Sequence, residues 1–183
     1  MIHWIMAESK DEKTGIEVAC EALFDFAIDR RDVADIMARL PEIQDACRAT
    51  VEHELQILKI ISVGWTLSYY LPAGPLKEEM TMRFWQAAHD FSKSLSSTAE
   101  LLIHQDVDFF AAVRGRFDKY LEEMKRHVNA PEPAVVIGPE FARCCRADGD
   151  VHTVMAGSRI FVGTVNKVKS YLEANGLGSS PLQ

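Results

Sequence analysis

The chain has 183 residues, of which 48% are hydrophobic and 26% are charged, and its formal net charge at pH 7 is −7. This is the composition of a globular domain, and the length is sufficient to bury a core without disulfides or structural metals. An acidic chain lacks the clustered Lys and Arg that bind a phosphate backbone or an anionic membrane, so neither nucleic acid nor a membrane is an expected partner.

The cysteines and the first residues predict a cytoplasmic location. Cys20 and Cys47 stand apart, Cys144 and Cys145 are adjacent, and no Cys-x-x-Cys pair occurs, so a disulfide framework is not expected. The opening residues MIHWIMAESKDEK contain no basic region followed by an apolar run and a small-residue cleavage site. No apolar run approaches the roughly 18 residues that a membrane span requires.

The first 75 residues show the three- and four-residue apolar period of amphipathic helices. A first helix is predicted over residues 16–40, with a joint near Asp32. Pro41 suits the first position of a helix, so a second helix is expected from about Pro41 to Leu71. The two prolines and one glycine of residues 72–75 cannot continue it, and they predict an antiparallel helical hairpin.

The rest of the chain is predicted to be helical in three further segments. A third helix covers residues 80–95 and ends in the polar cluster at 94–98, where Ser and Thr compete for backbone hydrogen bonds. A fourth helix runs from there to residue 129. Residues 130–138 contain two prolines and are predicted to be an extended linker. A last helix is expected over residues 150–173, and short strands are the alternative there because RIFVG also suits a strand.

These segments predict an all-α fold, an antiparallel bundle of about five or six helices. Residues 14–129 are expected to form the bundle core. Residues 130–183 are expected to be a smaller C-terminal segment that packs on the bundle, carries short strands in the alternative reading, and ends in a flexible tail.

One set of residues indicates a metal site. His53, the adjacent pair His89 and Asp90, and then Asp148 or Asp150 occur in this order along the predicted helices. This order resembles the HD superfamily of metal-dependent phosphohydrolases. The resemblance implies an all-α fold in which these residues hold a divalent metal ion that activates water toward a phosphoester. An HD-like phosphohydrolase is therefore the alternative hypothesis.

The preferred hypothesis is a non-enzymatic binding or regulatory module without a cofactor. The chain contains no G-x-S-x-G, no G-x-x-x-x-G-K-[ST] and no G-x-G-x-x-G motif. Its densest aromatic region flanks the turn at 72–75, and there Tyr70 and Trp85 fall off the apolar stripes that are predicted to face the core. Exposed aromatic surface is usually covered by a partner, so these two residues are expected to form a patch for a protein partner or for self-association.

Overall fold

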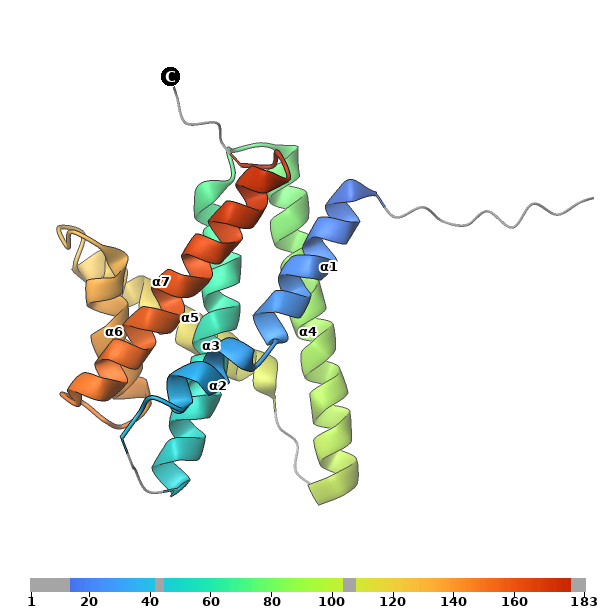
Figure 1. Ribbon diagram of the computed structural model, residues 1–183. Helices are drawn as coiled ribbons and strands as arrows, with labels where there is room; N and C mark the ends of the chain where they lie inside the picture. Colours follow the sequence, from blue (N-terminus) through green and yellow to red (C-terminus); the bar gives the residue numbers. More distant parts are fainter. Residues whose placement is uncertain (1–13, 42–44, 104–107, 179–183) are drawn as a thin grey trace, which may run out of the picture.

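The computed structural model describes residues 14–41, 45–103 and 108–178, and these form helices without any strand (Figure 1). The predicted all-α class is therefore confirmed. The seven helices are α1 (Gly15–Ile28), α2 (Arg31–Met37), α3 (Asp45–Tyr70), α4 (Pro75–Ile103), α5 (Phe109–Arg126), α6 (Pro133–Cys144) and α7 (Val151–Ala174). Of the predicted flexible tail, residues 179–183 lie outside the described residues.

The alternative of C-terminal strands is wrong, because residues 151–174 form one helix, α7. The carboxylate of Asp150 caps its first turn and accepts hydrogen bonds from the backbone N–H and the hydroxyl of Thr153, at 2.8 and 2.6 Å. Ile160 and Phe161 of the RIFVG segment are buried, whereas Val162 is 40% exposed. The segment thus follows the period of a helix, which its local β propensity does not override.

The predicted linker at residues 130–138 is also wrong, because most of it belongs to α6. Pro133 occupies the first turn of that helix, where the N–H that proline lacks would have no intrahelical partner. The chain also breaks after α1, where the carboxylate of Asp29 accepts the backbone N–H of Arg31 at 2.9 Å. The break lies near the joint predicted at Asp32, and with α6 the described residues form seven helices instead of the expected five or six.

The boundary predicted at residues 94–98 is wrong as well, since α4 continues through it to Ile103. The Ser94 hydroxyl donates to the carbonyl of Asp90, one turn earlier in the same helix, and this hydrogen bond is compatible with a continuous helix. The next helix begins at Phe109, where the carboxylate of Asp108 accepts the backbone N–H of Ala111 at 2.8 Å. Pro41 precedes α3 but is not part of it.

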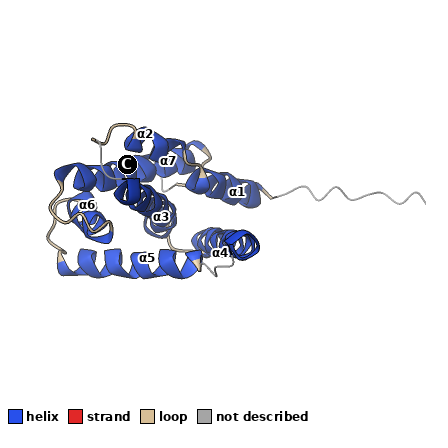
Figure 2. Cartoon of the chain, turned by 90° about the horizontal axis from the view of Figure 1, so that it is seen from below, coloured by secondary structure: helices blue, strands red, loops and turns tan. Residues whose placement is uncertain are grey.

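Helix α3 is the centre of the fold and contacts each of the other six helices. Seen from below, it lies between α5 on one side and α7 on the other (Figure 2). Its middle is buried on all sides, which is typical of a helix surrounded by others. A single hydrophobic cluster extends from Ala19 in α1 to Leu172 in α7, so the C-terminal helices share the core of the first 129 residues.

Two charged side chains of α3 are buried, and each has a partner. The carboxylate of Glu54 accepts two hydrogen bonds from the guanidinium of Arg116 in α5, at 2.8 and 2.5 Å. The ammonium of Lys59 donates to the carbonyl of Asp29 at 2.7 Å and lies 3.2 Å from the carboxylate of Asp32. Pairing of this kind offsets the cost of taking a charge out of water.

Glycines allow two close approaches between helices. A Cβ atom added at Gly138 in α6 would lie 2.8 Å from the carbonyl oxygen of Val154, and one at Gly157 in α7 would lie 2.6 Å from the ring of Phe141. The backbones of α6 and α7 therefore pack nearly against each other. No helix in the described part of the chain combines the length and apolar composition needed to cross a membrane.

Candidate functional groove

The residues of the HD-like hypothesis lie in different surroundings. His53 is exposed on α3 and makes an edge-to-face contact with Phe109, and His89 on α4 makes one with Phe110, at centroid separations of 5.9 and 5.2 Å. The side chain of Asp90 is 60% exposed and accepts hydrogen bonds from Gln86. Asp150 caps α7.

These placements do not form the metal site that the resemblance implies. The described residues include His53, His89, Asp90, Asp148 and Asp150, and among them no three His, Cys, Asp or Glu side chains are placed to hold a metal ion. The adjacent His89 and Asp90 do approach each other, with Nδ1 of His89 3.6 Å from a carboxylate oxygen of Asp90. The ring of His89 also contacts Phe110 of α5, and Asp90 lines the groove between α4 and α1.

The two aromatic residues expected to form an interaction patch contact different helices. The ring of Tyr70 lies beneath the ammonium of Lys169 in α7, 4.6 Å from the ring centroid. Trp85 is half-buried and packs edge-on against Phe117 in α5, at 5.7 Å. A Cβ atom at Gly64 in α3 would lie 2.3 Å from the Trp85 ring, so this ring fills the space that the glycine leaves. Tyr70 thus contacts α7, whereas Trp85 contacts α3 and α5.

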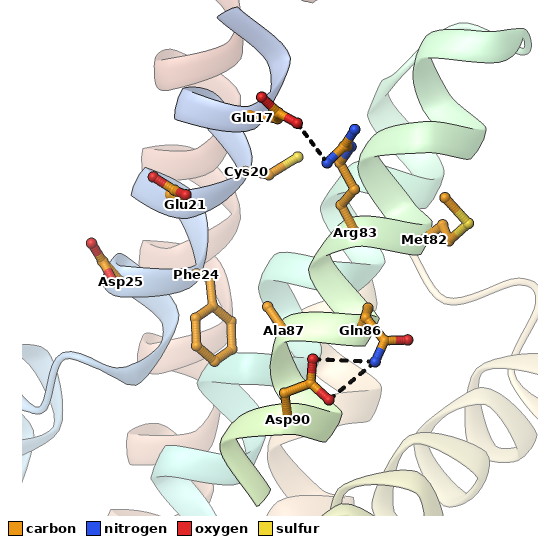
Figure 3. A pocket seen from close by; sticks show the side chains of 10 residues that line it. All are labelled: Glu17, Cys20, Glu21, Phe24, Asp25, Met82, Arg83, Gln86, Ala87 and Asp90. Carbon is orange, nitrogen blue, oxygen red and sulfur yellow. Dashed lines mark hydrogen bonds and ion pairs between the residues drawn. The ribbon is translucent and has the colours of Figure 1, made fainter. Parts of the chain in front are cut away.

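An open groove of about 690 Å³ lies between α1 and α4, and we call it the α1/α4 groove (Figure 3). The two helices run side by side and in the same direction (Figure 1). Their contributions follow the helical period, so each helix presents one stripe to the groove. The lining residues are Glu17, Cys20, Glu21, Phe24 and Asp25 of α1 and Met82, Arg83, Gln86, Ala87 and Asp90 of α4.

The floor of the groove is apolar and continuous with the core. Phe24 and Ala87 lie between the two helices, and the Phe24 ring contacts Phe84 and Phe91 edge-on with centroids 6.0 and 5.9 Å apart (Figure 3). Met82, at the edge, is 65% exposed. An apolar surface of this kind, bordered by polar groups, is typical of a binding site.

One wall of the groove is a row of carboxylates. Glu17, Glu21 and Asp25 follow one another at intervals of four residues, and all three line the groove. Asp90 adds a fourth carboxylate from α4, against the single guanidinium of Arg83. The groove therefore carries a net negative charge.

The charges are distributed unevenly along the groove. Near the start of α1, Glu17 lies 3.1 Å from the Arg83 guanidinium, which also bonds Glu79 at 2.9 Å (Figure 3). The Thr14 backbone N–H donates to Glu17 at 2.9 Å, and this hydrogen bond with the Arg83 charge holds the pKa of Glu17 below its usual value. At the other end Asp25 and Asp90 are not matched by any Lys or Arg among the residues that line the groove.

Three of the four thiols, those of Cys20, Cys144 and Cys145, are poor nucleophiles because burial raises their pKa. Cys20 lies in the groove, but burial raises the pKa of its thiol above the usual value, so the thiol stays protonated at neutral pH. Cys144 and Cys145 lie near Glu54, Arg116 and Tyr120, and burial likewise raises the pKa of each of the two thiols. The Tyr120 hydroxyl of this cluster is buried without a hydrogen-bond partner. The cluster is therefore part of the packing of α3, α5 and α6.

The α1/α4 groove was missed by reasoning from the sequence, although one signal for it is visible there. The period of four in Glu17, Glu21 and Asp25 places three like charges on one face of a predicted helix. What the sequence does not reveal is that α4 lies alongside this face. No family model matches the chain, and no characterised protein and no solved structure is significantly similar to it.

Proposed function

We propose that the protein is a non-enzymatic binding module whose α1/α4 groove receives an amphipathic helix of a partner protein. The observation that carries the proposal is the groove itself, an apolar floor open along its length between two parallel helices. A third helix can lay its apolar face into such a groove, as helix-in-groove complexes do. The lining from Glu17 to Asp25 spans about 12 Å of helix, which corresponds to about two turns of a partner helix.

A small-molecule substrate fits this groove less well. Ligand pockets enclose most of the surface of their ligand and bring a few polar groups together around it. The α1/α4 groove is open, and its polar groups stand along the rim, where Glu17 and Arg83 pair with each other and Asp90 with Gln86. The protonated Cys20 thiol does not supply a nucleophile. These features favour a binding role over catalysis.

The proposal can be tested with a synthetic helical peptide of about 14 residues, or four turns. It carries Leu at the spacing of one helix face and Gln or Ala elsewhere, so it is apolar on that face and uncharged. We expect saturable binding, with amide NMR shifts concentrated in α1 and α4. Ala87→Trp fills the groove and should abolish peptide binding, whereas Ala22→Trp, on the exposed face of α1, should leave peptide binding unchanged.

Two results would reject the proposal. The first is the absence of saturable shifts in α1 and α4, and the second is undiminished binding by Ala87→Trp. Self-association through Tyr70 and Trp85 stays a prediction, and light scattering of the wild-type chain and of Tyr70→Ala checks it. The contacts of Trp85 with Gly64 and Phe117 make the α1/α4 groove the better-supported surface.

A further inference from the structure

The charges of α1 indicate the chemistry of the partner. Glu17, Glu21 and Asp25 are the only charged side chains of this helix, and all three lie on the wall of the α1/α4 groove. Like charges spaced by four residues repel each other in a helix. The arrangement therefore costs stability within α1, and an external cation would offset this cost.

Two of the three carboxylates, Glu17 and Asp25, stand at opposite ends of α1 and affect the helix in different ways. Glu17 completes the capping box with Thr14 and pairs with Arg83. Asp25 stands in the last turn of α1, where the helix dipole favours a cation, and α1 has no basic residue in that turn. An acidic side chain at this position is unfavourable for the helix, so its placement on the groove is better explained by binding.

We infer that the partner helix is basic and carries Lys or Arg residues along one edge of its apolar stripe, spaced by four residues. This inference rests on the proposed function. Cations spaced in this way face Glu21 and Asp25, which stand one turn apart on the wall, while the apolar stripe covers Phe24 and Ala87. Arg83 repels a cation at the Glu17 end, so the basic residues belong at the end formed by Asp25 and Asp90.

The experiment compares three peptides that share one apolar stripe and differ only in whether Gln, Glu or Lys residues border it. The Lys peptide is expected to bind in the groove about tenfold more tightly than the Glu peptide, with the Gln peptide between them. At about 1 M salt, where the Debye length is about 3 Å, the three affinities should converge.

A pair of matched variants tests whether the preference for the Lys peptide arises from the carboxylates on the wall of the α1/α4 groove. Asp25→Lys should weaken binding of the Lys peptide about fivefold, as expected for reversing one partly exposed charge pair. Asp118→Lys makes the same change in net charge on the exposed face of α5 and should alter the affinity less than about twofold. Equal effects of both variants would overturn the inference, since the attraction would then belong to the net charge of the protein.

The peptide series separates this inference from the proposed function. If all three peptides bind equally in the groove, the protein is a helix-binding module and the inference of a basic partner is overturned. If the Gln peptide does not bind in the groove, the proposed function itself fails. A dimer that Ala87→Trp dissociates would also overturn the inference, because a second copy of this acidic chain would then be the occupant.

Discussion

The ammonium of Lys59 lies 3.2 Å from the carboxylate of Asp32, 2.7 Å from the carbonyl oxygen of Asp29 and 4.3 Å from the centroid of the Phe26 ring. The Lys59 side chain is buried, and it joins the centre of α3 to the joint between α1 and α2. Burial lowers the pKa of Lys59, and the charge of Asp32 opposes this shift. The carboxylate of Asp32 therefore offsets the free-energy cost of burying the Lys59 ammonium.

We therefore expect Asp32→Asn to lower the free energy of unfolding by about 2 kcal/mol, because it leaves a buried cation without its counter-charge. Lys59→Met keeps a side chain of similar length and removes the buried charge. It should cost less, about 1 kcal/mol, mainly through the lost hydrogen bond to Asp29. Urea unfolding of both variants measures the difference, and a smaller loss for Asp32→Asn than for Lys59→Met would contradict this account.

Helices α6 and α7 end in the same hydrogen-bonded motif with different residues at the left-handed position. After α6 the backbone N–H of Ala147 donates to Ala142 and Arg146 has a φ of 57°. After α7 the N–H of Leu177 donates to Leu172, and Gly176 has a φ of 67°. Glycine adopts this conformation without strain, whereas a side chain with a Cβ atom does not.

Arg146→Gly is therefore expected to raise the free energy of unfolding by about 0.5 to 1 kcal/mol, and Gly176→Ala to lower it by a similar amount. Thermal unfolding checks both changes. The arginine is exposed, so little packing is lost with its side chain. If Arg146→Gly lowered the free energy of unfolding, the guanidinium of Arg146 in the wild type would have to make a stabilising contact that outweighs the backbone strain.

Acid should destabilise the protein partly through Asp29. Hydrogen bonds from the side chain and backbone of Arg31 lower the pKa of Asp29 to about 2, against an ordinary value of 3.8. The folded state thus holds this carboxylate ionised where the unfolded state protonates it. Its contribution to stability is complete above about pH 4 and is lost as the pH falls toward 2.

Asp29→Asn removes this titration, so the difference in stability between wild type and Asp29→Asn should shrink as the pH is lowered from 5 to 2. Denaturant unfolding at several pH values measures it. The pKa of Asp150 is also lowered, by hydrogen bonds from Thr153, and the same comparison applies to Asp150→Asn, which keeps the helix cap. A constant difference over the whole pH range would contradict the assignment.

The fit between Gly64 and Trp85 predicts a specific effect of one methyl group. Gly64→Ala would place a Cβ atom 2.3 Å from the Trp85 ring, which is far inside van der Waals contact. The ring must then move outward, at a cost of about 1 to 3 kcal/mol. We expect lower stability together with a red shift of tryptophan fluorescence, and the Gly64→Ala/Trp85→Leu double variant should recover part of the lost stability.

The helical class followed from apolar periodicity, but the faces of α3 were predicted only in part. The heptad-like apolar spacing within residues 41–71 predicts one buried stripe, and four of its residues are indeed buried. The stripe consists of Cys47, Val51, Leu55, Leu58, Ser62, Trp65 and Tyr69, of which Val51, Leu55, Leu58 and Ser62 are buried. Cys47 and Tyr69, at its two ends, are exposed. A straight helix drifts about 20° per seven residues from such a stripe, so the stripe turns out of the core at both ends.

The sequence predicts that Trp85 lies off the core, but its side chain is half-buried because of how α4 packs against α3. It lies off the apolar stripe of its own helix, yet the missing side chain at Gly64 makes room for its ring on α3. The apolar periodicity of one helix does not predict where the helix packed against it lacks a side chain. The α1/α4 groove was unpredicted for the same reason: the acidic row is visible in the sequence, but its position beside Met82 and Ala87 depends on how two distant helices pack.

Asp32 also accepts a hydrogen bond from Lys167, at 2.6 Å and across 135 residues of chain. One carboxylate thus joins the start of the fold, its central helix and its last helix. Closing so long a loop is entropically costly, and contacts between distant residues slow the folding of a chain. We expect the Asp32–Lys167 contact to form after α3 has packed against its sequence neighbours. Loss of this contact should then mainly accelerate unfolding, with little change in the folding rate.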